Sequence, residues 1–215
     1  MARANIYGTA FGGGAYGFGV VFELTNSGGV WTESVLHSFS NTPDGANPEN
    51  GLTWDLASNL NGIATIGGTG NGKGCVYALS PSGSTWTEQV IYDINSTHSG
   101  LTLDPTTGII YGTSYGTIFE LTANGSGGWV PTVIYTFNPA SSATEGSNPL
   151  GTLGLDGAGN LYGTTQTGGA NSVGVVFKLA FSNTIPGRNA FVLLRRQWPI
   201  RPQRRYSCGR SCPRS

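Results

Sequence analysis

The sequence predicts an all-β fold assembled from repeated units of four short antiparallel strands. Three observations lead to this prediction: the glycine content, a hexapeptide that recurs four times, and a tryptophan-led strand that follows three of its copies. Glycine contributes 35 of the 215 residues and proline 11, so few windows of ten residues could propagate a helix. Apolar residues make up 38 % of the chain, enough for a core, and no Gly-X-Y period indicates collagen.

The hexapeptide Gly-x-(Val/Ile)-(Phe/Tyr)-x-Leu predicts the third strand of each unit. Its copies occupy residues 19–24, 74–79, 116–121 and 174–179. The aromatic members, Phe22, Tyr77, Phe119 and Phe177, are 55, 42 and 58 residues apart. This spacing is typical of β-propeller blades, which hold four antiparallel strands each, whereas hexapeptide β-helices have far shorter periods.

A longer strand that begins with tryptophan follows three of the hexapeptides, at residues 31–39, 86–94 and 129–137. Large residues recur along it, as at Trp31, Val35 and Phe39. Side chains at even spacings lie on the same face of a strand. We therefore expect these three residues, and their counterparts in the other two strands, to be buried together on one face.

Two shorter strands precede the hexapeptide. The second strand of the unit is expected at residues 6–9, 110–113 and 161–164, with a degenerate copy near 63–64. The first strand is expected at 101–104 and 153–156, followed by tight turns at 105–108 and 157–160. The units then span about residues 5–39, 51–94, 100–137 and 150–180, which together form a β-propeller-like repeat domain over residues 1–180.

Glycine also marks the connections between the second and third strands. The doublets at 12–13, 67–68 and 168–169 lie there, and the first residue of each hexapeptide is glycine. Backbone with a positive φ favours glycine, so we expect tight left-handed turns at these places.

The ends of the array are predicted to be incomplete. The first unit begins at its second strand, and the last stops after its third. Unpaired sheet edges favour aggregation, so we expect the chain to be a fragment of a longer propeller. The alternative is that residues 190–194 supply the missing outer strand.

The formal net charge of zero conceals two unlike segments. Residues 1–180 hold all 11 acidic residues and three basic ones, a formal charge of −8. Residues 181–215 hold eight arginines and no acidic residue. We expect this basic tail, which abandons the repeat pattern, to be disordered or non-native. Contact with the acidic body and an arm for nucleic acid or an anionic membrane remain alternatives, while no nucleic-acid binding is expected of the body itself.

One stretch of the repeat resembles a known family. Asn160-Leu-Tyr-Gly-Thr-Thr165, Gly168-Gly-Ala-Asn171 and residues 174–179 are similar to the GloVer tandem repeat of bacterial surface-type proteins. The resemblance covers residues 5–180 in four copies, of which the second lacks the Tyr-Gly-Thr core. It implies a propeller-like β repeat in an exported or cell-surface protein, with no established catalytic residues. Neither a signal peptide nor a transmembrane segment is visible in the sequence.

A phosphate-binding loop is suggested by residues 67–74, which fit the pattern Gly-x4-Gly-Lys. Gly74 stands where the loop needs Ser or Thr for Mg²⁺, and the following residues predict a strand where the loop needs a helix. We therefore expect a structural loop here and no nucleotide cofactor.

The histidines and cysteines give no catalytic constellation. His37 holds the position of an aromatic residue in the equivalent strands, and His98 lies in a polar loop between units. Cys75 is predicted to be a small core residue. Cys208 and Cys212 in the tail could close a short disulfide or bind metal. A nucleophilic triad therefore has no support.

An acidic motif recurs between units, as Asp44-Gly-Ala-Asn-Pro48 and Glu145-Gly-Ser-Asn-Pro149. Carboxylate and amide oxygens suit Ca²⁺, so Asp44, Asn47, Glu145 and Asn148 are candidate metal ligands. Asn-Pro is also good turn chemistry, and a structural turn is the favoured interpretation.

These observations predict a non-catalytic repeat module that binds an unidentified protein or carbohydrate through its loop surface. The alternative is a propeller enzyme, a hydrolase or lyase, that uses loop carboxylates as acid and base.

Overall fold

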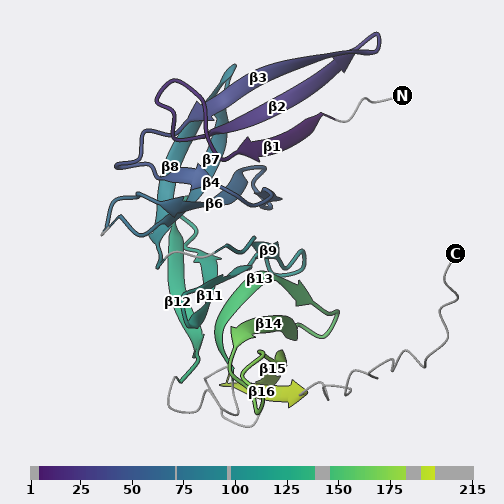
Figure 1. The fold of residues 1–215 in the computed structure, drawn as a ribbon. Coiled ribbons are helices and arrows are strands. Elements are labelled where there is room, and N and C mark those ends of the chain that lie inside the picture. The colour runs from purple at the N-terminus through teal and green to yellow at the C-terminus, as the bar shows by residue number, and fades with distance from the viewer. Residues whose placement is uncertain (1–4, 71, 96–97, 139–145, 183–189, 197–215) are drawn as a thin grey trace, which may run out of the picture.

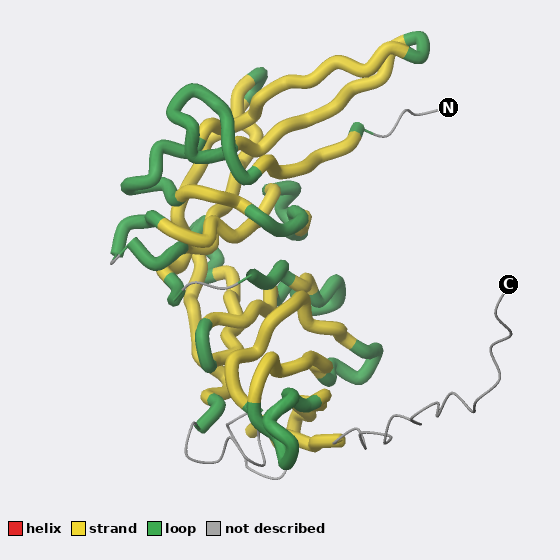
Figure 2. Tube along the Cα trace, in the orientation of Figure 1, coloured by secondary structure: helices red, strands yellow, loops and turns green. Residues whose placement is uncertain are grey.

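The structure, a computed structural model, describes residues 5–70, 72–95, 98–138, 146–182 and 190–196. Within these residues the fold is all-β, without helices, and its 16 strands form four antiparallel sheets (Figures 1 and 2). The predicted fold class is thus confirmed as all-β. The sheets follow one another along the chain, from sheet 1 at the top of Figure 1 to sheet 4 at the bottom.

Each sheet is a meander in which strands consecutive in sequence are hydrogen-bonded neighbours, as short connections favour. Sheet 1 contains β1 (Ile6–Ala10), β2 (Val20–Ser27) and β3 (Val30–Ser38). Sheet 2 contains β4 (Ala46–Pro48), β5 (Thr53–Trp54), β6 (Leu60–Ile66), β7 (Cys75–Ser82) and β8 (Thr85–Asp93), with β4 and β5 both pairing with β6. Sheet 3 contains β9 (Thr102–Leu103), β10 (Ile110–Ser114), β11 (Thr117–Ala123) and β12 (Trp129–Thr136). Sheet 4 contains β13 (Ser147–Leu155), β14 (Leu161–Thr167), β15 (Val176–Ser182) and β16 (Ala190–Arg196).

The two ends of the array differ from each other. Sheet 1 has three strands, as expected of an incomplete first unit. The expectation that the last unit is incomplete is wrong, because β16 pairs with β15 along its whole length as the outer strand. Residues 190–196 therefore belong to a sheet and not to a disordered tail. The remainder of the expected tail, residues 183–189 and 197–215, lies outside the described residues.

The tryptophan-led strands do not bury one continuous face, so that expectation is also wrong. A β-bulge interrupts the pairing of β2 with β3, and equivalent bulges occur between β7 and β8 and between β11 and β12. Val35 pairs with Phe22 while His37 pairs with Val21, so the strand changes faces in between. Consequently Trp31 and Val35 are about half exposed, at 49 % and 53 %, whereas Phe39 is fully buried.

The core lies between successive sheets, and the hexapeptide aromatics dominate it. Three of these rings, Tyr77, Phe119 and Phe177, face the preceding sheet and meet an aromatic ring from the end of that sheet's outer strand, edge to face. The ring centroids are 4.9 Å apart for Phe39 and Tyr77, 5.2 Å for Tyr92 and Phe119, and 5.3 Å for Phe137 and Phe177. Such pairs add stability beyond the area that they bury. Each sheet therefore depends on the one before it.

Most glycines between the second and third strands adopt the expected left-handed backbone, although in the doublet 12–13 only Gly13 has a positive φ. Both residues of the doublets 67–68 and 168–169 have positive φ, as do all four hexapeptide glycines. At Gly74 a Cβ would lie 2.7 Å from the carbonyl oxygen of Ala64, so a side chain is excluded by space as well as by conformation.

Candidate functional site

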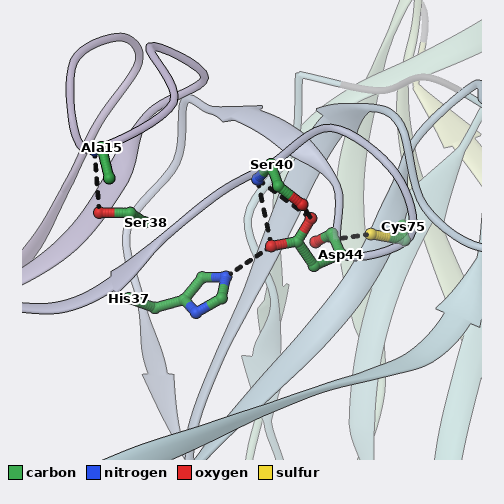
Figure 3. A network of polar contacts seen from close by, with 6 residues as sticks. All are labelled: Ala15, His37, Ser38, Ser40, Asp44 and Cys75. Carbon is green, nitrogen blue, oxygen red and sulfur yellow. Dashed lines mark hydrogen bonds and ion pairs between the residues drawn. The ribbon is translucent and has the colours of Figure 1, made fainter.

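The carboxylate of Asp44 lies at the centre of a polar network in the connection between sheets 1 and 2 (Figure 3). The backbone N–H of Ser40 donates to both carboxylate oxygens at 3.1 Å, and its hydroxyl donates to Oδ1 at 2.7 Å. Nε2 of His37 lies 2.9 Å from Oδ2. Asp44 is buried, so its carboxylate has lost most of its hydrating water. The three donors from Ser40 and His37 take the place of that water. The network holds the turn that leads into β4.

His37 occupies an aromatic position, as the sequence predicts. Its ring meets Phe39 at a centroid distance of 4.8 Å, much as Tyr135 meets Phe137 at 5.0 Å. No sequence pattern indicates its carboxylate partner, Asp44, which lies seven residues further along the chain. In a nucleophilic triad the imidazole stands between the serine and the carboxylate, but here the carboxylate stands between Ser40 and His37. This arrangement stabilises the turn between His37 and Asp44.

Cys75 and His98 are also placed by the structure. Cys75 is fully buried, as predicted, and its thiol lies 3.9 Å from the carbonyl oxygen of Asp44. Burial raises the pKa of this thiol, which keeps it protonated and unreactive. His98 contacts the carboxylate of Glu49 through Nδ1. Cys208 and Cys212 lie outside the described residues.

The candidate calcium ligands belong to two connections that share one backbone conformation. Asn47 and Asn148 have φ of 55° and 57°, and the glycines two residues before them are also left-handed. The amide of Asn47 donates to the carbonyl oxygen of Phe11 at 3.0 Å, and that of Asn148 donates to Gln166 at 2.7 Å. Glu145 lies outside the described residues. Among the described residues no three His, Cys, Asp or Glu side chains are grouped as metal ligands would be, and calcium binding stays a prediction.

The loop that resembles a phosphate-binding motif connects β6 with β7. Residues 75–82, which follow it, form a strand and not the helix that a phosphate-binding loop requires. This confirms the predicted strand after the loop.

A second set of carboxylates fixes the turns that join β5 to β6, β9 to β10 and β13 to β14. Asp55, Asp104 and Asp156 each accept from the backbone N–H two residues later, at 2.9, 2.8 and 3.0 Å. Asp55 and Asp156 also accept from the backbone and amide of an asparagine four residues later. The sequence predicts two of these turns but misses the one at Asp55, although residues 52–59 match the other two copies.

These Asp turns line two successive grooves between sheets. The first groove, of 410 Å³, lies between the Asp55 turn and residues 107–109, with Trp129 on one wall. The second groove, of 780 Å³, lies between the turns that begin at Asp104 and Asp156. Thr107 and Ile109 line both grooves. Two neighbouring sheet boundaries thus present equivalent hollows.

The electrostatics of the larger groove are set by its turns. The hydroxyl of Thr107 lowers the pKa of Asp104, and the amide of Asn160 lowers the pKa of Asp156. Both carboxylates are therefore ionised at neutral pH and rigidly oriented. Burial raises the pKa of Tyr111 on the groove wall to about 12. The groove is acidic at its rims and apolar along Ile109 and Leu155.

No protein-family model matches the chain, and no curated protein matches it either. In the described part of the chain, nothing helical has the length and apolar character that a bilayer crossing requires.

Proposed function

We propose that the four sheets are successive blades of a β-propeller-like array and that this array is a non-catalytic binding module of an exported or cell-surface protein. The stacked meanders, the interlocking aromatics and the resemblance of residues 5–180 to the GloVer repeat support this proposal.

The observation that carries the proposal is the pair of equivalent grooves between Asp turns. Each turn is locked by its own hydrogen bonds, so the groove needs little ordering when a ligand enters, which favours binding. The hydroxyls of Thr106 and Thr107 and the amide of Asn160 lie beside apolar walls, a mixture suited to a carbohydrate or to an extended peptide.

The groove carboxylates are poorly suited to the alternative of a propeller enzyme. A general acid needs a pKa near the working pH, whereas hydrogen bonds lower the pKa of both Asp104 and Asp156. Their oxygens already accept donors from their own turns. These residues support a rigid binding surface better than proton transfer.

The test blocks each groove with a bulky side chain at equivalent turn positions. Ala57→Trp fills the smaller groove and Ala158→Trp the larger one, and both keep the backbone N–H that bonds the aspartate. Ser84→Trp, in the exposed hairpin between β7 and β8, is the matched control. Binding is measured on an oligosaccharide array and against a displayed peptide library.

We expect the affinity for the oligosaccharides or peptides that the unchanged protein binds to fall about tenfold or more in at least one groove variant. The control variant should bind them as the unchanged protein does. Binding that survives both groove variants would refute the proposed site. Turnover of a bound oligosaccharide or peptide would favour the enzyme.

A further inference from the structure

One face of sheet 1 is apolar and uncovered. We call the side of a sheet that points toward the preceding sheet its leading face, and the opposite side its trailing face. Cross-strand pairing places Ile6, Phe22, Leu24, Trp31, Glu33 and Val35 on the leading face of sheet 1, besides Ala10, Asn26 and Val20, of which Val20 is already buried. Ile6 is 50 % exposed, close to the values for Trp31 and Val35. Among the described residues no sheet covers this face.

The positions of Ile6, Phe22 and Leu24 are buried wherever a preceding sheet exists, whereas the position of Val35 is open in sheet 3 as well, where Val133 is 48 % exposed. Tyr77, Phe119 and Phe177 stand at the position of Phe22 in the later sheets, and none of them is more than 1 % exposed. Phe22 is only partly buried, although its ring lies over Gly8 just as the other rings lie over their glycines. The leading face of sheet 1 is therefore built like the internal faces and lacks only its cover.

Sheet 4 presents the matching cover at the opposite end of the array. Its trailing face carries Tyr162, Thr164, Val176 and Lys178, at the positions of Tyr7, Thr9, Val21 and Glu23 in sheet 1. Val21 packs against sheet 2 and is fully buried, whereas Val176 is 46 % exposed. Tyr162 is 37 % exposed.

The interface between sheets 1 and 2 shows how these two faces would meet. The ring of Tyr7 contacts that of Trp86 at 6.3 Å between centroids. Glu23 is the cross-strand partner of Tyr7, and Glu88 follows Trp86 by two positions on the same strand. The buried Oε1 of Glu88 has no hydrogen-bond partner among the described residues.

The two open faces carry residues of opposite charge, Glu33 on the leading face of sheet 1 and Lys178 on the trailing face of sheet 4. Trp31 and Glu33 occupy the positions of Trp86 and Glu88, since both strands read Trp-Thr-Glu. Tyr162 and Lys178 occupy those of Tyr7 and Glu23. Docked in the same way, Tyr162 would meet Trp31. Lys178, whose ammonium lies 5.4 Å from the centroid of the Tyr162 ring, would bring a positive charge to the face that carries Glu33.

We infer that the leading face of sheet 1 binds the trailing face of sheet 4 from a second copy of this chain. The same contact repeated by a two-fold axis covers both open faces of both copies. It closes eight sheets into one ring, within the range of about four to eight blades seen in propellers. The inference rests on the stacking of sheets and on the propeller-like array of the proposed function, not on ligand binding in the grooves.

Charge reversal of the full chain tests this interface in reducing buffer. Sedimentation velocity across a concentration series measures the dimer dissociation constant for the unchanged protein, Glu33→Lys, Lys178→Glu and the double variant. Circular dichroism and the melting temperature at low concentration verify that each variant folds. Glu33 is exposed and Lys178 partly so, which favours folded variants.

We expect a dimer that each single reversal weakens about tenfold or more and that the double variant restores. A monomer at every concentration would overturn the inference, and so would growth into open polymers. A dimer whose dissociation constant is unchanged in both single charge-reversal variants would overturn the inference as well. The groove experiment reads ligand binding, so its failure is distinct from the failure of the dimer.

Discussion

Replacing the glycine beneath a hexapeptide aromatic tests whether successive sheets lock each other in place. In every sheet the strand before the hexapeptide strand carries a glycine that lies beneath the hexapeptide aromatic ring. These glycines are Gly8, Gly62, Gly112 and Gly163. A Cβ at Gly112 would stand 2.4 Å from Cζ of Phe119, and one at Gly8 would stand 2.6 Å from Cζ of Phe22. Neither glycine has a left-handed backbone, so alanine fits both conformations. The two sites differ in what covers the ring.

The expected cost follows from that cover. Phe119 is fully buried against sheet 2, and Leu101 also lies 3.0 Å from the added Cβ, so the ring cannot move without disturbing its neighbours. Overpacking of this kind costs about 1–3 kcal/mol, partly offset by about 0.5–1 kcal/mol for removing a strand glycine. We expect Gly112→Ala to destabilise the protein by about 1–2 kcal/mol. At roughly 2–4 °C per kcal/mol, the melting temperature falls by about 2–8 °C.

Gly8→Ala is the matched control because the ring of Phe22 can shift into the open side of sheet 1. We expect its free energy of unfolding to change by less than about 0.5 kcal/mol, since the relief of a strand glycine offsets a small ring movement. Urea denaturation at a protein concentration that keeps the chain monomeric measures both variants. Equal destabilisation by the two substitutions would refute the idea that the preceding sheet fixes the ring.

Two further predictions concern buried carboxyl groups in sheet 2. Asp55→Ala leaves two turn N–H groups without their acceptor, so the free energy of unfolding should fall by about 1–3 kcal/mol. Asp55→Asn keeps an acceptor oxygen and should lower it less. Urea denaturation measures both variants, and equal losses would contradict the assigned hydrogen bonds. Burial raises the pKa of Glu88 from 4.5 to about 7, so the folded state holds an extra proton between those values. The contribution of Glu88 to the free energy of unfolding should therefore be greatest below pH 4.5 and be lost as the pH rises to about 7. If the pH dependence of stability in this range persists in Glu88→Gln, it comes from another residue.

The repeat itself could be predicted from the sequence because its strands carry local signals. Each hexapeptide forms a strand next to the outer strand of its sheet (β2, β7, β11 and β15), and its first glycine has the expected left-handed backbone. The outer face of the tryptophan-led strands could not be predicted by alternation, since one extra residue at each bulge reverses the pattern. The sequence offers β16 only as an alternative outer strand, because residues 190–196 lack the tryptophan-led pattern of the other units, and the pairing with β15 bears this alternative out.

The candidate site was less accessible to sequence reasoning. The partner of His37 lies across a turn, and the link to Asp44 depends on the backbone path between them and on no local pattern. The Asp55 turn did carry a signal, since Asp55 and Asn59 match Asp156 and Asn160 in spacing. The grooves have no sequence signature at all, because each is formed by two turns about 50 residues apart.

The leading face of sheet 1 is unusual for the end of a stacked array. Terminal units of stacked arrays usually carry a polar outer face, because nothing covers it. Sheet 1 departs from this rule, since Ile6, Trp31 and Val35 expose about half of their surface. The burial of a hexapeptide aromatic is therefore decided by the neighbouring sheet and not by its own sequence. An end that keeps the residues of an internal face is built to be covered, and Lys178 opposite Glu33 favours a second copy as the cover.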